Sequence, residues 1–316
     1  MKLTRVCLLG GTGFVGRHLA ARLSARGLHL RIPTRHPQRH RDLLLLAGTQ
    51  MVAADVHDQE ALERLFDGCE AVVNLVGILN EQGRDGRGFV HAHVDLAKKV
   101  INACQRKGVR RLLHMSALRA ENTPDTSHYL RTKAEAESLV HTLSGPALAV
   151  TSLRPSVIFG PGGDFLSRFA ELIEAIPGVF PLACAEARFQ PVFVGDVADA
   201  FADALADPET YGARIDLCGP RSYTLRALVE YVARLRGLRR QVVALPDWIA
   251  RAEARILERM PGKAFTMDNY LSLRVDSVCA DGAKHCPTTL EEIAPRYLGD
   301  QQPQRQFDRL RDLGQY

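Results

Sequence analysis

Three glycines follow the first apolar segment of the chain and limit what this segment can fold into. Gly10, Gly13 and Gly16 stand between the apolar run Val6–Leu9 and an amphipathic segment that begins at Phe14. Glycines at this spacing allow a tight turn after a strand, a close backbone approach to a ligand, and close packing of the next helix. The free N–H groups at the start of such a helix bind anions. The pattern therefore predicts a strand–turn–helix unit that holds a diphosphate.

Apolar runs and amphipathic segments alternate over the first half of the chain. We predict buried strands at Val6–Leu9, Leu28–Pro33, Met51–Ala54, Ala71–Leu75, Leu112–Met115 and Ala149–Leu153. Strands that alternate with helices imply right-handed crossovers and a parallel sheet covered on both faces. The sequence therefore predicts an α/β fold: a doubly wound parallel Rossmann sheet with a smaller mixed C-terminal subdomain.

The rhythm of the elements changes after about residue 160. We expect a dinucleotide-binding domain over 1–160 and about 188–218, a substrate or partner subdomain over 161–187 and 219–299, and a loosely ordered tail over 300–316. In this half we predict a strand at Arg188–Val194, a helix from about Asp196 to Leu205, a helix capped by Thr224, a short strand at Gln241–Leu245 and a helix over Pro246–Glu258. Trp248 in the last helix is expected in the core; the alternative is a partner-binding helix.

Composition excludes several classes of protein. The 36 acidic residues are interspersed among 41 basic ones, so the net charge of +5 forms no polybasic block and we expect no nucleic-acid partner. The seven cysteines are scattered, and we expect reduced thiols and no metal site. No run reaches the roughly 18 apolar residues of a spanning helix, so we expect no membrane insertion. We expect the protein in the cytoplasm, either free or peripheral at the inner membrane.

Further residues at the ends of the predicted strands are expected to contact the ligand. In the glycine-rich turn, the expected contacts are Gly10, Thr12, Gly13, Phe14, Val15 and Gly16. Folds that prefer NAD place an acidic residue after the second strand, but here Arg35 follows, and its guanidinium matches a 2′-phosphate. We therefore prefer NADP(H) over NAD(H) as cofactor; the alternative is that Arg35 belongs to a solvated basic loop.

The ends of the third and fourth strands complete this edge. Asp55 is placed to accept from the adenine amino group, and Val56 to cover the ring. After the next strand, we expect the backbone to run close to the ribose at Leu75, Val76 and Gly77. These positions fall at the carboxyl ends of the strands, where open α/β sheets bind ligands.

Several further motifs resemble the extended short-chain dehydrogenase/reductase superfamily. The resemblance covers about residues 4 to 298, and the motifs are the glycine-rich turn, Asp55-Val56, Tyr129–Lys133, Arg154–Gly162 and Pro191–Ala198. More narrowly, the chain is similar to an atypical subgroup related to the nucleotide-binding accessory subunit of respiratory complex I, and its motifs are Arg154–Gly162, Ala187–Val194, Leu217–Pro220 and Arg274–Ser277. The resemblance implies a Rossmann fold and a nicotinamide cofactor. It also implies a respiratory complex as one class of partner.

The resemblance implies catalytic roles for a tyrosine–lysine pair. Lys133 would hold the nicotinamide ribose and stabilise the phenolate of Tyr129, which would exchange a proton with the substrate oxygen. Alanine stands at position 117, where the family has a hydroxyl, and Ser116 is the nearest replacement. His93 stands where the family has asparagine. The loop with Pro155, Ser156 and Ile158 would meet the nicotinamide carboxamide, although a plain turn is an equal alternative.

Two functions follow from these residues. The first is a cofactor-binding module of a larger assembly, with weak or no catalysis, which the departures at Ala117 and His93 favour. The second is an active NADP(H)-dependent oxidoreductase or nucleotide-sugar epimerase that acts on a small carbonyl or hydroxyl substrate, which the Tyr129–Lys133 pair favours.

Overall fold

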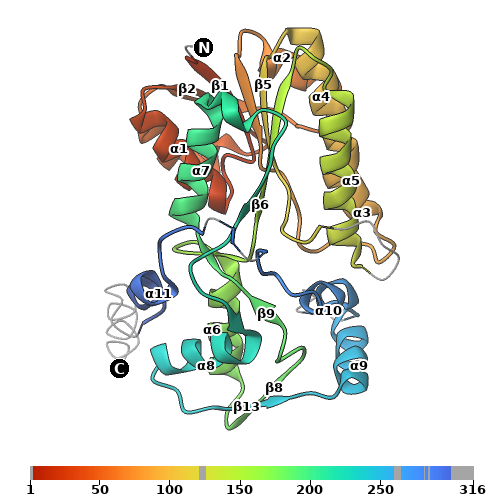
Figure 1. The fold of residues 1–316 in the computed structure, drawn as a ribbon, viewed down its shortest axis with the longest axis vertical. Coiled ribbons are helices and arrows are strands. Elements are labelled where there is room, and N and C mark those ends of the chain that lie inside the picture. Colours follow the sequence, from red (N-terminus) through yellow and green to blue (C-terminus); the bar gives the residue numbers. More distant parts are fainter. Residues whose placement is uncertain (1–2, 121–125, 260–264, 281, 284, 300–316) are drawn as a thin grey trace. The chain divides into compact units, whose positions relative to one another are not determined.

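The computed structural model describes residues 3–120, 126–259, 265–280, 282–283 and 285–299. They form two compact units (Figure 1). The first unit comprises the chain up to Pro155 together with Val194–Leu217, and the second comprises Ser156–Phe193 and the chain from Cys218 onward. Each unit has its own hydrophobic core.

The first unit is built on a seven-stranded parallel sheet. Its strands are β1 (Arg5–Leu9), β2 (His29–Thr34), β3 (Thr49–Ala53), β4 (Ala71–Asn74), β5 (Arg111–Met115), β6 (Ala149–Pro155) and β11 (Arg214–Leu217). The order across the sheet is β11-β6-β5-β4-β1-β2-β3, so the direction of winding reverses between β1 and β4. Open α/β sheets bind ligands at such a reversal. The predicted fold class and the six predicted strands are confirmed.

Helices cover both faces of this sheet (Figure 1). One face carries α1 (Phe14–Ala25) and α7 (Val194–Ala206), and the other carries α2 (Gln59–Phe66), α4 (Leu96–Lys107) and α5 (His128–Leu143). Shorter helical segments are η1 (Pro37–Leu45), α3 (Arg87–Phe89), the π-helix η2 (Val90–Asp95) and η3 (Pro208–Thr210). The predicted helix from about Asp196 is confirmed and starts two residues earlier, at Val194.

The second unit combines helices with three two-stranded sheets. Its helices are α6 (Asp164–Ala175), α8 (Leu225–Leu235), α9 (Asp247–Leu257), α10 (Met267–Leu273) and α11 (Leu290–Leu298). Its strand pairs are β7 (Ile158–Phe159) with β10 (Val192–Phe193), β8 (Val179–Leu182) with β13 (Gln241–Ala244), and β9 (Arg188–Phe189) with β12 (Tyr223–Thr224). The predicted cap at Thr224 is confirmed, because its hydroxyl accepts from the Ala227 N–H at 3.1 Å.

The prediction of one continuous strand over Arg188–Val194 was wrong. This segment forms β9 and β10, which belong to separate sheets. The interruption lies at Gln190, whose side-chain amide donates to the Gly219 carbonyl at 2.8 Å and accepts from the Cys279 N–H at 3.0 Å. The side chain thus bonds the backbone of two other segments of the unit.

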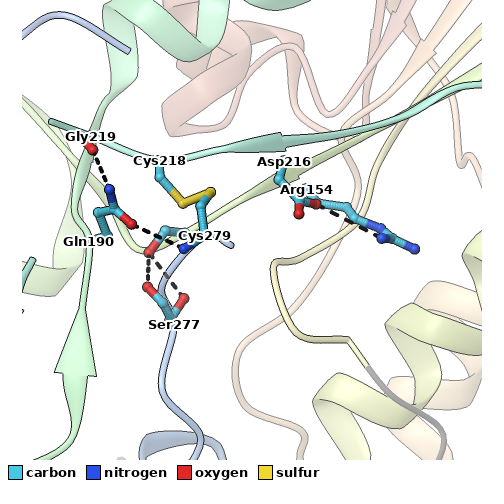
Figure 2. Close-up of a disulfide and its surroundings, with 8 residues drawn as sticks. Arg154, Gln190, Asp216, Cys218, Gly219, Ser277 and Cys279 are labelled. Carbon is cyan, nitrogen blue, oxygen red and sulfur yellow. Dashed lines mark hydrogen bonds and ion pairs between the residues drawn. A yellow bond between two sulfur atoms is a disulfide. The ribbon is translucent and has the colours of Figure 1, made fainter. Parts of the chain in front are cut away.

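The prediction that every cysteine is reduced was also wrong. Cys218 and Cys279 form a disulfide across 61 residues of sequence (Figure 2). Gln190 holds the Cys279 backbone, and the Ser277 carbonyl accepts from the Ser156 hydroxyl at 2.7 Å. Tertiary contacts of this kind bring the two cysteines together, so the spacing of cysteines in the sequence could not reveal the pair.

The prediction that Trp248 lies in the core was wrong as well, because its side chain is 72% exposed. Helix α9 turns two small residues inward, Ala250 and Ala254, which pack with Tyr270. The amphipathic pattern was recognised, but its apolar face was assigned to the wrong side. The predicted tail over 300–316 lies outside the described residues. No helix of the described chain has the length and apolar character needed to cross a bilayer.

Candidate functional site

The glycine-rich turn between β1 and α1 leaves open space beside the backbone. Gly10 has a φ of +76°, which favours glycine, and its carbonyl accepts from the Gly13 N–H at 3.0 Å. A Cβ on Gly16 would lie 2.2 Å from the Gly10 carbonyl oxygen, so no side chain fits there. A Cβ on Gly13 would meet only that oxygen, at 3.3 Å. The space above Gly13 is thus open, as a bound diphosphate requires.

The start of α1 suits an anion. Gly13 caps the helix without a side-chain hydrogen bond, and the first turn contains no acidic residue. Phe14 is half-buried and Val15 is buried, while the Thr12 carbonyl accepts from the Arg17 side chain at 3.1 Å. Backbone N–H groups and the helix dipole therefore provide the positive potential here.

The ends of β2 and β3 present the residues expected at the adenosine end. Arg35 is exposed directly after β2. The Asp55 carboxylate accepts from the His57 N–H at 2.9 Å, and Val56 packs against the core cluster of the first unit. His57 stacks on the ring of His91 at 4.1 Å, and burial lowers its pKa. The sequence reasoning missed this histidine pair, which follows no recognisable motif.

The segment after β4 brings the backbone close to a buried lysine. The Val76 N–H donates to the Asn74 side chain at 3.2 Å, and Leu75 is buried beside it. A Cβ on Gly77 would lie 3.1 Å from Lys133 Nζ, so a side chain here would crowd the ammonium. The structure therefore brings together two predicted positions, Gly77 and Lys133, that are far apart in the sequence.

The predicted tyrosine–lysine pair lies on α5. Lys133 is 3% exposed, and its ammonium donates to the Met115 carbonyl at 3.0 Å. Burial lowers the pKa of Lys133 to about 8. Tyr129, one turn earlier, is half-buried, and its ring packs edge-on against His93 with the centroids 5.7 Å apart. One helix face thus presents a phenol and an ammonium next to the end of β4.

His93 links the end of β4 to α5. Its Nε2 accepts from the Ile78 N–H at 3.2 Å, and its Nδ1 lies 2.8 Å from the Thr132 hydroxyl. Because Nε2 accepts, the hydrogen-bond network assigns the proton to Nδ1. Burial and the Lys133 charge lower the pKa of His93 to about 2, so the ring is neutral. His93 therefore ties together the two segments that carry Gly77 and Tyr129.

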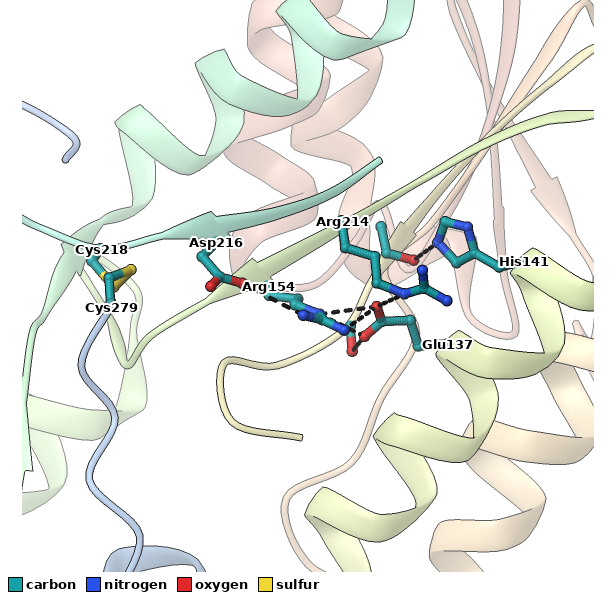
Figure 3. A network of polar contacts seen from close by, with 9 residues as sticks. Glu137, His141, Arg154, Arg214, Asp216, Cys218 and Cys279 are labelled. Atoms are coloured by element: carbon teal, nitrogen blue, oxygen red, sulfur yellow. Dashed lines mark hydrogen bonds and ion pairs between the residues drawn. A yellow bond between two sulfur atoms is a disulfide. The ribbon is translucent and has the colours of Figure 1, made fainter. Parts of the chain in front are cut away.

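Ser116 takes part in a buried polar network. It follows β5, which ends at Met115, and its hydroxyl donates to Glu137 at 2.6 Å. Glu137 is 3% exposed and also binds Arg154 at 2.7 Å and Arg214 at 2.9 Å (Figure 3). Ala117, where the family has a hydroxyl, is buried. The Ser116 hydroxyl is thus held by the carboxylate.

The sequence reasoning missed the stripe that continues along α5. Tyr129, Lys133, Glu137 and His141 follow one another at intervals of four residues and therefore share one helix face. His141 lies 3.0 Å from the Ser152 hydroxyl on β6 (Figure 3). The four-residue spacing of ionisable residues was the available signal.

The predicted loop after β6 divides between the two units. Pro155 ends β6, and its carbonyl accepts from the Leu118 N–H at 3.0 Å in the first unit. Ser156 is buried in the second unit, where its hydroxyl bonds Ser277, and Ile158 starts β7. The side chain of Ser156 thus has a structural partner. Its backbone remains a predicted contact of the nicotinamide carboxamide.

A family match over two thirds of the chain decides the family. The model of the NAD dependent epimerase/dehydratase family matches residues 6–217. The chain belongs to this family. The short-chain dehydrogenase/reductase resemblance is thereby confirmed.

Relatives extend the comparison beyond the family. A mouse protein, NADH dehydrogenase [ubiquinone] 1 alpha subcomplex subunit 9, is 30% identical over 231 residues, which cover 71% of this chain and 59% of that protein. This chain thus spans less than two thirds of that relative. A ceramide reductase of Caulobacter vibrioides is 28% identical over 245 residues, covering 77% of this chain and 74% of that enzyme. Among solved structures, UDP-glucose 4-epimerase of Thermotoga maritima superposes with a TM-score of 0.74 at 16% identity, covering 97% of this chain and 100% of that one, and shows the shared fold.

Proposed function

We propose that this protein is an NADP(H)-dependent oxidoreductase that reduces a ketone on a long-chain lipid. The observation that carries the proposal is the Tyr129–Lys133 pair on one face of α5, with the Lys133 ammonium against Gly77 at the end of β4. A buried cation at this place serves a ligand, because burial makes an ammonium costly to keep. The similarity to a ceramide reductase supports the lipid substrate class.

The residues divide the chemistry as follows. The cofactor, when bound, supplies the hydride. Backbone N–H groups from Gly13 onward bind its diphosphate, and Lys133 binds its ribose hydroxyls and stabilises the charge on Tyr129. Tyr129 donates the proton to the substrate oxygen. His93 keeps the β4 end and α5 at a fixed separation, since it bonds both.

The proposed reaction predicts a preference for long-chain ketones. With NADPH in excess, a 3-oxo long-chain lipid in detergent should oxidise the cofactor at least roughly tenfold faster than a short water-soluble ketone, because each buried methylene adds binding energy of about 0.8 kcal/mol. Loss of NADPH absorbance measures the rate. Equal and background rates for both ketones would contradict the reductase function.

A second candidate function is a cofactor-binding module without turnover. It is favoured by Ala117 and by the Ser116 hydroxyl being held by Glu137, because a missing hydroxyl donor typically costs on the order of a hundredfold in rate. Similarity to the mouse respiratory-complex subunit supports it. Binding of NADPH with no turnover of any ketone would favour this module.

The proposed NADP(H) preference rests on Arg35. Its exposed guanidinium follows β2, where a carboxylate would accept from an unmodified ribose. Arg35→Asp should weaken NADPH binding at least roughly tenfold more than NADH binding, because a charge-assisted pair is replaced by repulsion. Fluorescence titration with both cofactors measures the ratio. Arg39→Asp, which changes the charge nearby, is the control, and an unchanged affinity ratio in Arg35→Asp would contradict the assignment.

A further inference from the structure

Helix α9 presents an exposed face that combines apolar and basic side chains. Ala252, Arg255 and Ile256 follow Trp248 by four, seven and eight residues, and all four lie exposed on one side of the helix. Arg259 is exposed in the turn after the helix and extends this face, because its guanidinium donates to the Arg255 carbonyl. Trp248 is 72% exposed and Ile256 is 61% exposed. This helix face therefore holds two large apolar side chains in water.

The charges on α9 are separated between its two sides. Arg255 and Arg259 lie on the exposed face, and the structure pairs neither with a described carboxylate; Arg259 donates to the Arg255 carbonyl at 3.4 Å. The acidic groups lie elsewhere on the helix. Asp247 pairs with Arg251 at 2.8 Å and accepts from the Tyr270 hydroxyl. The exposed face is therefore apolar and cationic, without an acidic side chain.

The inner side of α9 explains why the large residues point outward. Ala250 and Ala254 pack with Tyr270, so this side has room only for small residues. The strand pair that precedes α9 also carries exposed apolar side chains: Val243 on β13 is 41% exposed and Val179 on β8 is 53% exposed. Figure 1 shows β13 leading into α9. The outward position of Trp248 is thus fixed by packing.

We propose that the exposed face of α9 binds the surface of an anionic lipid bilayer. Tryptophan and isoleucine enter the region between headgroups and acyl chains, while arginines bind phosphate and extend their charge to the water. A face of five residues is small for a stable protein interface, which buries about 1,200 Å² or more. Shallow insertion into lipid needs no such area. The proposal goes beyond the proposed function and does not depend on turnover.

Trp248 provides a direct probe, because it is the only tryptophan in the chain. The full-length protein is mixed with vesicles of phosphatidylcholine alone or of phosphatidylcholine with phosphatidylglycerol. We expect a blue shift of the tryptophan emission and co-sedimentation with the anionic vesicles only, at low salt. Added salt should weaken both signals, because it screens the arginines.

Charge-reversal variants test the face itself. Arg255→Glu/Arg259→Glu should lower the vesicle partition coefficient by roughly an order of magnitude or more, since each basic residue near an anionic surface contributes to binding. The matched control is Arg64→Glu/Arg87→Glu, which makes the same change in net charge on exposed residues of the first unit. Unchanged circular dichroism shows that each variant is folded.

Three outcomes would overturn the proposal. They are absence of binding to either vesicle, equal binding to neutral and anionic vesicles, and unchanged binding of Arg255→Glu/Arg259→Glu. A concentration-dependent self-association that this variant abolishes, without vesicle binding, would assign the face to a second copy of the chain instead. NADPH binding is measured in the same samples, so a failed membrane proposal is distinguished from a failed cofactor site.

Discussion

Replacing Tyr129 with phenylalanine is expected to lower the rate of ketone reduction by roughly 10²–10⁴-fold, the usual contribution of a positioned proton donor. The hydroxyl is the only group removed, and the ring keeps its edge-on contact with His93. NADPH affinity should therefore stay within about twofold of the wild type. Steady-state kinetics and fluorescence titration of NADPH measure the two quantities separately.

Lys133→Met distinguishes the lysine from the tyrosine. This variant should lose both the rate and NADPH affinity, because the Lys133 ammonium lies against Gly77, where the ribose would bind. Methionine keeps much of the buried volume of the lysine side chain. Equal rates in the wild type, Tyr129→Phe and Lys133→Met would contradict the reductase function and leave the cofactor-binding module.

The pH dependence follows from the same lysine. Burial lowers the pKa of Lys133 to about 8, so the free protein loses this positive charge as the pH rises through that value. NADPH affinity of the wild type should therefore fall above about pH 8. In Lys133→Met, NADPH affinity should not fall above this pH. A fall that persists in this variant would assign the titration to another group.

The first unit was largely predictable because its signals are local. The apolar runs and the spacing of Gly10, Gly13 and Gly16 specify strands and a turn within a few residues. Tyr129 and Lys133 are one helical turn apart, so their common face follows from the period of the helix. Strand β11 was not predicted, because only two of its four residues are apolar, Ile215 and Leu217.

The second unit was less predictable because its contacts join distant residues. The disulfide between Cys218 and Cys279 depends on how Gln190 and Ser277 hold the backbone, which no local pattern reveals. Trp248 was misplaced because an amphipathic helix can turn either side to the core, and only packing on Tyr270 decides which. In the first unit, the role of Ser116 likewise depends on a distant residue, Glu137, which lies 21 residues away.

Gly13→Ala should impair cofactor binding, whereas Gly16→Ala should impair folding. At Gly13 the φ of −77° suits alanine, and its Cβ would meet only the Gly10 carbonyl oxygen, at 3.3 Å, a tight contact that a shift of a few tenths of an ångström relieves. The melting temperature should therefore stay close to that of the wild type. The methyl group occupies the space for the diphosphate, so NADPH affinity should fall by roughly a hundredfold, which is about 2.7 kcal/mol.

Gly16→Ala should act on the fold itself. Its Cβ would lie 2.2 Å from the Gly10 carbonyl oxygen and 2.6 Å from the Gly11 Cα, both of which are backbone atoms. The turn and α1 must move apart, which is expected to cost about 1–3 kcal/mol of stability as overpacking does. Calorimetry measures the melting temperature, and Gly13→Ala is the control, since it adds the same methyl group to the same turn at a position with a negative φ. If Gly13→Ala bound NADPH as well as the wild type, the diphosphate would not lie on this turn, and the proposed cofactor site would be wrong.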